Sequence, residues 1–257
     1  MTLPTYDFSG KVVLVTGGGT GIGAVTAELF AKSGATVVIA ARNAERLAER
    51  AEAIGPNCIA IPADVTDEAQ CQALIAKTLD SFGKLDVLVN NAGGARHSSI
   101  AKFRTDKWLA EFDLNLHSAF YCARAAGEAM ITAGSGAIVN ISSTAGTTGT
   151  MGCAPYSAAK AGLQMFTRVA AAEWGPRGVR VNCVAAGMIA TGLAQSNWAK
   201  AGFDPTKACK DFPLRRPGRP EEVTQAVLFL ASEAASYITG ETLLVAGGPR
   251  LGGMIDV

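Results

Sequence analysis

Short apolar runs and longer amphipathic segments alternate along almost the whole chain. The runs are rich in β-branched residues and lie at 12–15, 36–40, 57–61, 85–89, 137–141, 179–184 and 242–245. Consecutive apolar positions are typical of strands buried on both faces, whereas a half-exposed strand alternates apolar and polar residues. The alternation therefore predicts an α/β fold, with a doubly wound, mostly parallel sheet of about seven strands and helices on both faces.

The segments between the runs have helical periodicity and lie at 22–33, 43–54, 67–82, 105–133, 154–174 and 220–235. No linker or internal repeat separates them, so we expect a single domain over residues 1–257. The region 186–219 breaks the pattern because it is rich in glycine, proline and lysine. Long segments of this kind often cover binding sites, and we expect a substrate lid at about 188–215.

Composition argues against several classes of function. The net charge is only +1, which does not favour nucleic acid or acidic membranes as partners. No apolar run is long enough to span a bilayer, and MTLPTYDFSG at the N-terminus lacks the form of a signal peptide, so we expect a cytoplasmic protein. The six cysteines have no metal-like spacing and there are two histidines, which predicts buried, reduced thiols and no metal site.

A glycine-rich loop, TGGGTGIG at 16–23, joins the first apolar run to the first helical segment. Glycines at such a junction permit a tight turn and bring phosphate oxygens close to the N–H groups that begin the helix. A flexible turn is the alternative, but it would not need five glycines in the seven positions 17–23. The loop predicts a dinucleotide site in a Rossmann-like fold, with contacts from Gly17, Gly19, Thr20, Gly21, Ile22 and Gly23.

The end of the second run bears on which dinucleotide binds. Sites for NAD usually place an acidic residue there to bind both ribose hydroxyls, but this run ends in Ala41, Arg42 and Asn43, with no acid before Glu45. A guanidinium is well shaped to bind a 2′-phosphate. Arg42 therefore favours NADP(H) over NAD(H), and a solvated arginine at the start of the next helix is the alternative.

Two further strand ends face the same edge of the predicted sheet. Asp64, followed by Val65, has a carboxylate that can accept from the adenine amino group or cap the helix that begins near Asp67, and both interpretations stay open. The fourth run ends in NNAG, where the small residues Ala92 and Gly93 allow the adenosine ribose of the cofactor to lie against the backbone. The side chain of an asparagine in this motif is expected to tie neighbouring strands together. We expect Asn91, Ala92 and Gly93 to contact the cofactor.

Tyr156 and Lys160 lie four residues apart in APYSAAK, which places them on one face of a helix. Alone, this spacing is not specific. Together with TGGGTGIG, NNAG, GRPEEV, YITGE and VAGG in this order, it makes nearly the whole chain resemble the short-chain dehydrogenase/reductase family in its single-domain form.

The resemblance implies four catalytic residues. Tyr156 is expected to be the general acid/base, and Lys160 to lower its pKa and bind the nicotinamide ribose. Ser143, thirteen residues before Tyr156, is expected to orient the substrate carbonyl, and Asn115 to hold a water that links Lys160 to solvent. Lowering a tyrosine pKa from about 10 to about 7 requires roughly 4 kcal/mol of preferential stabilisation of the phenolate.

The resemblance also extends to the region after the sixth strand. Gly187, Ile189 and Thr191 are expected to contact the cofactor, with Thr191 at the nicotinamide amide. The family usually has Pro-Gly where this chain has Ala186-Gly187, and the loss of the proline predicts a looser turn beside the nicotinamide. The family also often has Ser where this chain has Ala159, outside the expected proton relay.

The implied function is an NADP-dependent oxidoreductase that acts on a carbonyl or secondary alcohol, such as a ketone or 3-oxoacyl group. Reduction of a C=C bond in an enoyl- or dienoyl-CoA is an alternative, although Ser143 beside Tyr156 suits ketone chemistry better. A non-catalytic dinucleotide-binding regulator would be expected to have lost Tyr156 or Lys160. The relatives are usually homotetramers that pair through the two long helices, here 105–133 and 154–174.

The substrate pocket is expected at 94–98, 144–153 and 188–215. Cationic side chains around the expected lid can meet the anionic tail of an acyl-CoA or an acyl-carrier protein: Lys200, Lys207, Lys210, Arg215 and Arg216. A solvated loop surface is the alternative interpretation, and it is the favoured one.

Overall fold

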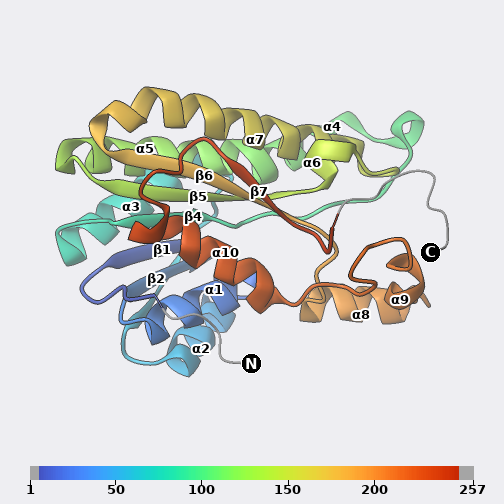
Figure 1. Ribbon diagram of the computed structural model, residues 1–257, viewed down its shortest axis with the longest axis horizontal. Helices are drawn as coiled ribbons and strands as arrows, with labels where there is room; N and C mark the ends of the chain where they lie inside the picture. The colour runs from blue at the N-terminus through green and yellow to red at the C-terminus, as the bar shows by residue number, and fades with distance from the viewer. Residues whose placement is uncertain (1–5, 249–257) are drawn as a thin grey trace.

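The computed structural model describes residues 6–248 and confirms the predicted doubly wound α/β fold (Figure 1). One parallel sheet has the strand order β3-β2-β1-β4-β5-β6-β7. Its strands are β1 (Val12–Thr16), β2 (Thr36–Ala41), β3 (Cys58–Pro62), β4 (Val87–Asn90), β5 (Gly136–Ser143), β6 (Val179–Ala186) and β7 (Thr242–Val245). Residues 1–5 and 249–257, which belong to the expected domain and include the start of the N-terminus tested for a signal peptide, lie outside the described residues.

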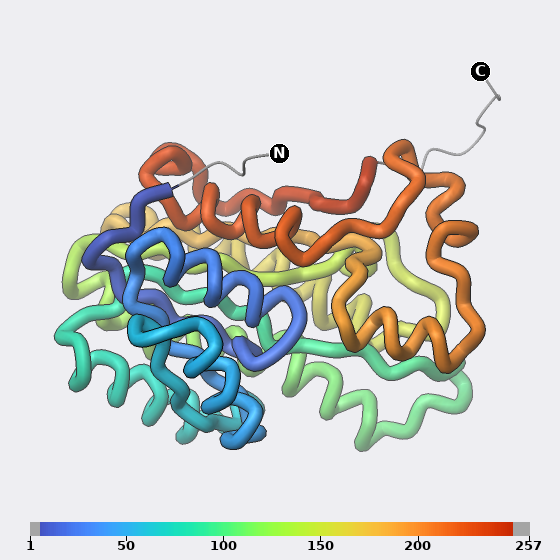
Figure 2. Tube along the Cα trace, turned by 90° about the horizontal axis from the view of Figure 1, so that it is seen from below, coloured from blue at the N-terminus to red at the C-terminus, as the bar shows by residue number. Residues whose placement is uncertain are grey.

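Within residues 6–248, helices cover both faces of the sheet (Figures 1 and 2). One layer contains α1 (Gly21–Lys32), α2 (Ala44–Ile54) and α10 (Pro220–Ala231), and the other contains α3 (Glu68–Phe82), α5 (Ser118–Ala133) and α7 (Ala154–Trp174). None of the helices between residues 6 and 248 is long and apolar enough to cross a membrane.

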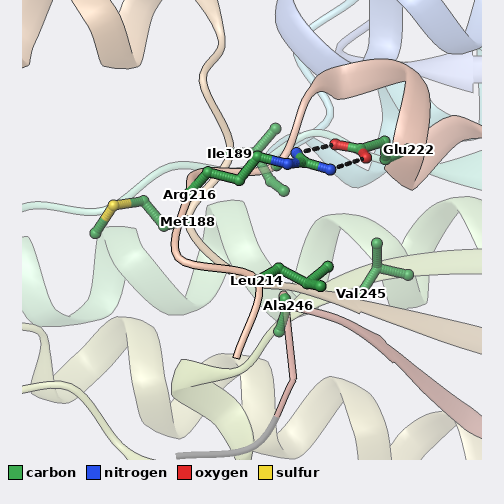
Figure 3. Close-up of a pocket in the computed structure, with 9 residues that line it drawn as sticks. Met188, Ile189, Leu214, Arg216, Glu222, Val245 and Ala246 are labelled. Atoms are coloured by element: carbon green, nitrogen blue, oxygen red, sulfur yellow. Dashed lines mark hydrogen bonds and ion pairs between the residues drawn. The ribbon is translucent and has the colours of Figure 1, made fainter. Parts of the chain in front are cut away.

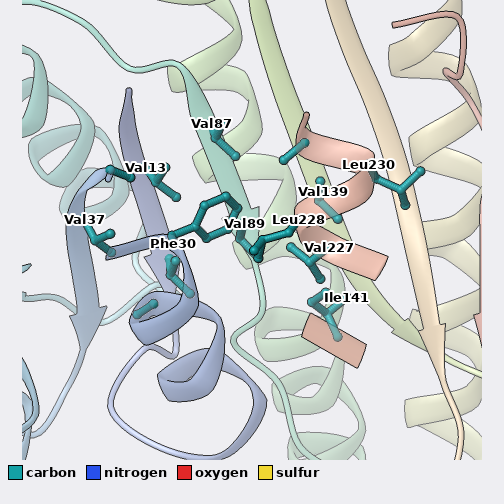
Figure 4. Packing of buried hydrophobic residues seen from close by; sticks show 14 of the residues in the cluster. Val13, Phe30, Val37, Val87, Val89, Val139, Ile141, Val227, Leu228 and Leu230 are labelled. Atoms are coloured by element: carbon teal, nitrogen blue, oxygen red, sulfur yellow. The ribbon is translucent and has the colours of Figure 1, made fainter. Parts of the chain in front are cut away.

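Alternate residues of each central strand enter different cores, which explains why the runs are continuously apolar. Val13 of β1 belongs to the core beneath α1 and α10, whereas Leu14 belongs to the core beneath α3, α5 and α7. Figure 4 shows the first core, where Phe30 of α1 and Leu228 of α10 lie over the central strands. Both side chains are almost fully buried, so the two helices are fixed against the sheet that carries the site.

The direction of strand order reverses between β1 and β4, because the chain runs outward from β1 to β3 and then returns to β4. The loops that follow β1 and β4 therefore diverge to opposite sides of the sheet. A crevice at the carboxyl ends of the strands is the expected result, and ligands bind there in open α/β sheets.

The structure differs from the predicted elements in three places. The helix expected over 105–133 consists of α4 (Thr105–Phe112), a π-helical turn η2 (Asp113–His117) and α5. The region 186–219, expected to be irregular, contains α8 (Gly192–Lys200) and α9 (Pro205–Ala208), which are capped by the side chains of Thr191 and Asp204. The remaining expected helices and strands agree to within a few residues, apart from the last helix, which ends at Ala231 and is followed by a short 3₁₀ turn.

Candidate active site

A cleft of about 320 Å³ opens at the carboxyl edge of the sheet, beside the crossover between β1 and β4. It brings together most of the residues that the sequence nominates. These are Gly17, Thr20, Gly21, Ile22, Asn91, Ala92, Gly93, Ser143, Tyr156, Lys160, Gly187, Ile189 and Thr191.

The glycine loop packs closely against the end of β4. Gly17 has a φ of +66°, and a Cβ at this position would lie 2.8 Å from Asn91 Nδ2. A Cβ at Gly23 would overlap the same Nδ2 and the carbonyl oxygen of Gly17. Two of the loop glycines are therefore required by close approach between backbone and side chain, as expected for a loop that must turn tightly.

Asn91 and Thr16 tie β4 to β1 at this point. Asn91 Nδ2 donates to the carbonyl oxygens of Thr16 at 2.9 Å and Gly17 at 3.2 Å. Thr16 Oγ1 accepts from the N–H groups of Asn91 and Ala92 at 3.0 and 3.1 Å. The expectation that an asparagine of NNAG links neighbouring strands is confirmed.

The loop fits the phosphates of a dinucleotide. The N-cap of α1, Thr20, makes no side-chain hydrogen bond to the helix, so the N–H groups of its first turn have no capping partner from that residue. These groups, together with the positive end of the helix dipole, suit an anion. A Cβ added to Gly19 would meet Ala41 at 3.9 Å, which places this end of the loop beside the end of β2.

Arg42 lies directly after β2 and is exposed. No hydrogen bond or ion pair joins its guanidinium to another residue of the described chain. The helix that follows is capped by Asn43, whose side chain accepts from Arg46 N at 2.8 Å. Arg42 is thus not needed to begin α2, and its side chain is exposed at the end of β2.

Asp64 does not cap α3, so that interpretation is wrong. Asp67 is the N-cap and accepts from Gln70 N at 3.2 Å, because it directly precedes the first helical residue, Glu68. One oxygen of Asp64 instead accepts from the N–H and hydroxyl of Thr66 at 3.0 and 2.8 Å. The interpretation of Asp64 and Val65 as adenine contacts stays a prediction.

Tyr156 lies in the first turn of α7, and Lys160 follows on the next turn, as the spacing predicted. Lys160 is 3% exposed, and its Nζ donates to the carbonyl oxygen of Ile141 at 2.8 Å. The same Nζ lies 5.8 Å from the centroid of the Tyr156 ring. Ser143 ends β5, and its Oγ accepts from Ala145 N at 3.1 Å.

A buried polar network positions α7 against the strands. Asn90 donates to Asn140 at 2.9 Å, and Asn140 donates to Thr167 of α7 at 2.9 Å. Closer to the cleft, Ser142 Oγ donates to the carbonyl oxygen of Lys160 at 2.9 Å and accepts from Gln164 at 3.0 Å. These contacts fix the helix that carries Tyr156 and Lys160.

Asn115 occupies the π-helical turn and is 1% exposed. Its Nδ2 donates to the carbonyl oxygens of Gly94 at 2.8 Å and Glu111 at 3.0 Å, and its Oδ1 accepts from Gly94 N at 3.1 Å. A Cβ at Gly93 would lie 2.9 Å from Asn115 Oδ1 and 3.1 Å from Lys160 Nζ. The side chains of Asn115 and Lys160 thus both border Gly93. Single π-helical turns such as the one that carries Asn115 are frequent at functional sites.

Comparisons with known proteins agree with this geometry. A family model described as "Enoyl-(Acyl carrier protein) reductase" matches residues 17–249. A 3-oxoacyl-[acyl-carrier-protein] reductase of Synechocystis sp. is 41% identical over 243 residues, 93% of this chain and 96% of that protein. The cis-4-hydroxycyclohexanecarboxylate dehydrogenase of Sinomonas cyclohexanicum is 41% identical over 244 residues, 94% of this chain and 97% of that protein. A solved structure of a short chain dehydrogenase/reductase family protein has a TM-score of 0.86 at 38% identity, and the match covers 95% of this chain and 98% of that one.

The chain belongs to the short-chain dehydrogenase/reductase family. It is therefore an NAD(P)-dependent oxidoreductase that transfers a hydride between the nicotinamide and a carbonyl or alcohol carbon.

Burial shifts the pKa values of both Tyr156 and Lys160. Burial raises the pKa of Tyr156, Ser143 opposes this through a hydrogen bond, and Cys153 and Glu111 add to the rise. Lys160 Nζ donates to the carbonyl oxygen of Ile141, and the expectation that Lys160 lowers the pKa of Tyr156 stays a prediction. Burial also lowers the pKa of Lys160 to about 8.

The Ala186-Gly187 turn is held by neighbours on both sides, despite the absence of the family's proline. The carbonyl oxygen of Ala186 accepts from Thr144 N at 3.0 Å, and Gly187 N donates to Val245 O at 2.9 Å. Ala186 pairs with Ser143 of β5 and Val245 of β7, so the sheet constrains the backbone that proline would otherwise stiffen.

The segment after β6 is anchored at its far end by Arg216. Its two guanidinium nitrogens donate to the Glu222 carboxylate at 2.8 and 2.6 Å, above a cavity of about 80 Å³ (Figure 3). This ion pair lowers the pKa of Glu222 to about 2. Arg216 is thus occupied by Glu222, and Lys207, Lys200 and Lys210 in the same segment are exposed, with Lys207 Nζ 4.0 Å from Asp204.

Several residues that support the site were not nominated from the sequence. They are Thr16, Asn90, Asn140, Ser142, Gln164 and Glu111. The signal available for Asn90 and Asn140 was a polar residue inside a continuously apolar run, because such a residue needs a buried partner. Glu111 had no local signal, since its burial depends on a neighbouring loop.

The charge on Lys160 should reduce stability, which a Lys160→Met variant tests. Because the folded-state pKa lies below the ordinary 10.5, the protonated amine destabilises the fold fully below about pH 8, and this cost fades as pH rises toward 10.5. At pH 7 we expect the free energy of unfolding of the variant to exceed that of the parent by about 1–3 kcal/mol, and at high pH we expect a smaller difference. Denaturant unfolding without cofactor measures this.

Lys77→Met on the exposed face of α3 is the control and should change stability little at any pH. A Lys160→Met variant that is less stable than the parent at pH 7 would show that the hydrogen bond to Ile141 outweighs the cost of the buried charge.

Proposed function

We propose that this protein uses NADP(H) to reduce the ketone of a 3-oxoacyl thioester, carried on coenzyme A or an acyl-carrier protein. The observation that carries the proposal is the arrangement of Ser143, Tyr156 and Lys160 along one cleft, with the glycine loop at its other end. The names of the two 41%-identical relatives point to related chemistry, an oxo group in one and a secondary alcohol in the other.

Four side chains of the site have separate roles in the proposed reaction. When bound, NADPH supplies the hydride to the carbonyl carbon. Tyr156 gives a proton to the carbonyl oxygen, and the Ser143 hydroxyl donates a hydrogen bond that orients it. Lys160 binds the nicotinamide ribose, and Asn115 holds the water that links Lys160 to solvent. Burial keeps Tyr156 protonated, which is the form needed for reduction.

The residues that would hold the cofactor lie along the strand ends from β2 to β6. The first turn of α1 and its glycines would bind the pyrophosphate, and Asn91, Ala92 and Gly93 would contact the adenosine ribose. Asp64 and Val65 would contact the adenine. At the other end Gly187, Ile189 and Thr191 contact the nicotinamide, and the 188–215 segment with α8 and α9 forms a lid that Arg216 and Glu222 anchor.

Reduction of a conjugated C=C bond is the second candidate, because the matching family model carries an enoyl reductase description. Ketone reduction requires a proton donor at the oxygen, and Ser143 with Tyr156 forms a suitable pair there. We therefore place the ketone first.

Activity assays on a 3-oxoacyl-CoA and a 2-enoyl-CoA of equal chain length test the assignment. We expect NADPH consumption with the first, and Tyr156→Phe should lower kcat by about 10²–10⁴ because the proton donor is lost. NADPH binding, measured by fluorescence titration, should change little.

Tyr121→Phe is the matched control, because Tyr121 lies on α5 outside the cleft. It should retain parental kcat. Turnover of the enoyl substrate alone would replace the ketone assignment, and an unchanged kcat in Tyr156→Phe would remove Tyr156 from the mechanism.

Preference for NADP(H) rests on Arg42, which is exposed at the end of β2 with no acidic residue beside it. Arg42→Asp should weaken NADPH binding by about 10- to 100-fold, since a charge-assisted bond to phosphate contributes about 1.5–3 kcal/mol. It should also improve NADH binding, because the new carboxylate can accept from ribose hydroxyls.

Arg46→Asp, an exposed arginine one turn into α2, is the control for general charge effects. Fluorescence titrations with both cofactors give the comparison. An unchanged preference in Arg42→Asp would return Arg42 to the role of a solvated surface residue.

We further propose a homotetramer in the cytoplasm, where six buried cysteines suit a reducing compartment. Exposed apolar side chains lie on two separate surfaces. Phe120, Met165 and Val169 are 37%, 55% and 49% exposed on α5 and α7, while Leu243 and Leu244 are 40% and 52% exposed on the edge strand β7. Two independent apolar surfaces support two kinds of twofold contact.

Leu244→Glu should divide the tetramer into dimers that remain paired through α5 and α7, because a charge would be buried at the β7 contact. Sedimentation equilibrium measures this. Ile100→Glu, exposed outside both surfaces, should remain tetrameric. A parental protein that sediments as a monomer would overturn the assembly and leave the catalytic proposal unaffected.

A further inference from the structure

Glu111 is a carboxylate buried beneath the candidate active site. It lies in the last turn of α4 and is 1% exposed. Glutamate is almost never fully buried unless it is paired. Its carboxylate has side-chain partners on two residues: Asn115 Nδ2 donates to Oε2 at 3.3 Å, and Arg96 Nη1 donates to Oε1 at 3.4 Å. The backbone of Arg96 adds a further hydrogen bond. Both side-chain distances exceed the 2.7–2.9 Å typical of strong charge-assisted bonds, so neither side-chain contact is a strong one.

Glu111 is connected on one side to the reacting groups. Asn115, which it contacts, borders Gly93 together with Lys160 Nζ. Lys160 in turn faces the ring of Tyr156. A series of polar groups therefore runs from the cleft through Lys160 and Asn115 to Glu111, with each member almost fully removed from solvent except Tyr156, which is half-buried.

On its other side Glu111 approaches the surface. The Arg96 side chain is 55% exposed, so the Glu111 carboxylate lies one side chain away from solvent. His97, beside Arg96, is also exposed, and its Nδ1 lies 3.2 Å from Cys153 Sγ. The loop after β4 thus forms the outer wall of the Glu111 site.

The charges around Glu111 are coupled. Burial raises its pKa, while Arg96, His97 and Lys160 act in the opposite direction. In return, Glu111 raises the pKa of Lys160, Tyr156 and Cys153. The nearby π-turn pair Asp113 and His117 is half-exposed and its members contact each other at 2.9 Å, so its charges are screened by solvent.

We propose that Glu111 is the proton reservoir that restores Tyr156 after each carbonyl reduction. The inference rests on the proposed roles of Tyr156 and Lys160. Reduction forms a C–H bond with the hydride of NADPH and an O–H bond with the proton that leaves Tyr156. Lys160 returns a proton to the phenolate, the Glu111 carboxyl group reprotonates Lys160 through the water that Asn115 holds, and the carboxylate takes one proton from solvent at Arg96. One proton thus enters per alcohol formed. Glu111 acts through Lys160 and is a positioning residue of the proton path.

Substitutions at Glu111 test the path by steady-state kinetics. Glu111→Gln keeps the shape and the amide contact but carries no exchangeable acid proton. We expect kcat for 3-oxoacyl-CoA reduction to fall about 10-fold or more, with KM for both substrates within about twofold. The solvent deuterium isotope effect on kcat should increase because proton delivery becomes limiting. The fall of kcat with rising pH that Glu111 causes in the parent should disappear.

Glu111→Asp should recover part of kcat because it restores an acid. Asp113→Asn, which removes an exposed carboxylate from the adjacent π turn, should match the parent in all three measurements. A Glu111→Gln variant with the parental isotope effect and pH profile would overturn the proposal, whether its kcat is parental or reduced, since a purely structural role moves neither.

A second measurement needs neither turnover nor cofactor. Infrared difference spectra over a pH titration should show a buried carboxyl band that is absent in Glu111→Gln. In Lys160→Met this band should titrate at higher pH, because Lys160 lowers the pKa of Glu111. A band that titrates identically in Lys160→Met would break the link between the two groups. If Glu111→Gln is unstable, the comparison of the carboxyl band between the parent and Lys160→Met still tests the proposal. Parental enzyme that does not reduce ketones would instead refute the proposed function.

Discussion

Hydrogen bonds across the carboxyl ends of neighbouring strands hold the whole site in register. Asn91 and Thr16 join β4 to β1, Asn90 joins β4 to β5, and Asn140 continues to α7. Each such bond contributes only about 1 kcal/mol net, but a buried amide left without its partner costs about 1–3 kcal/mol. The strand ends therefore form one hydrogen-bonded frame, and the positions of the glycine loop and of α7 depend on it.

Within this frame the protein buries two ionisable side chains near the cleft. Lys160 and Glu111 are both almost fully removed from solvent, and burial shifts both pKa values toward the neutral forms. Neither group is bound by a short ion pair, so each retains the capacity to exchange a proton. Their destabilising effect is offset by two apolar cores that enclose the sheet on both faces. Such a compromise between stability and activity is common at functional sites.

The sequence predicted the relative position of the expected catalytic residues but not the contacts that their side chains make. The spacing of Tyr156 and Lys160 predicts one helical face, and α7 provides it. The expectation that Lys160 lowers the pKa of Tyr156 stays a prediction. Spacing along a helix does not reveal that Lys160 Nζ donates to a strand carbonyl. Arg216 likewise looked available to an anionic tail, but Glu222, six residues away, holds its guanidinium.

Local patterns by themselves determined the parallel sheet, the two helical layers and the glycine loop, because strand burial, helical periodicity and turn chemistry are properties of short segments. They also indicated that an asparagine of NNAG would tie strands together, and the bonds from Asn91 to Thr16 and Gly17 confirm this. Tertiary structure alone decided that Asp67 caps α3 and that a π turn places Asn115 beside Gly93. It also decided that Glu111 is buried in contact with Asn115. The reason is physical: the burial of a side chain, its hydrogen-bond partner and its pKa depend on atoms brought close by folding, and these are distant in the sequence.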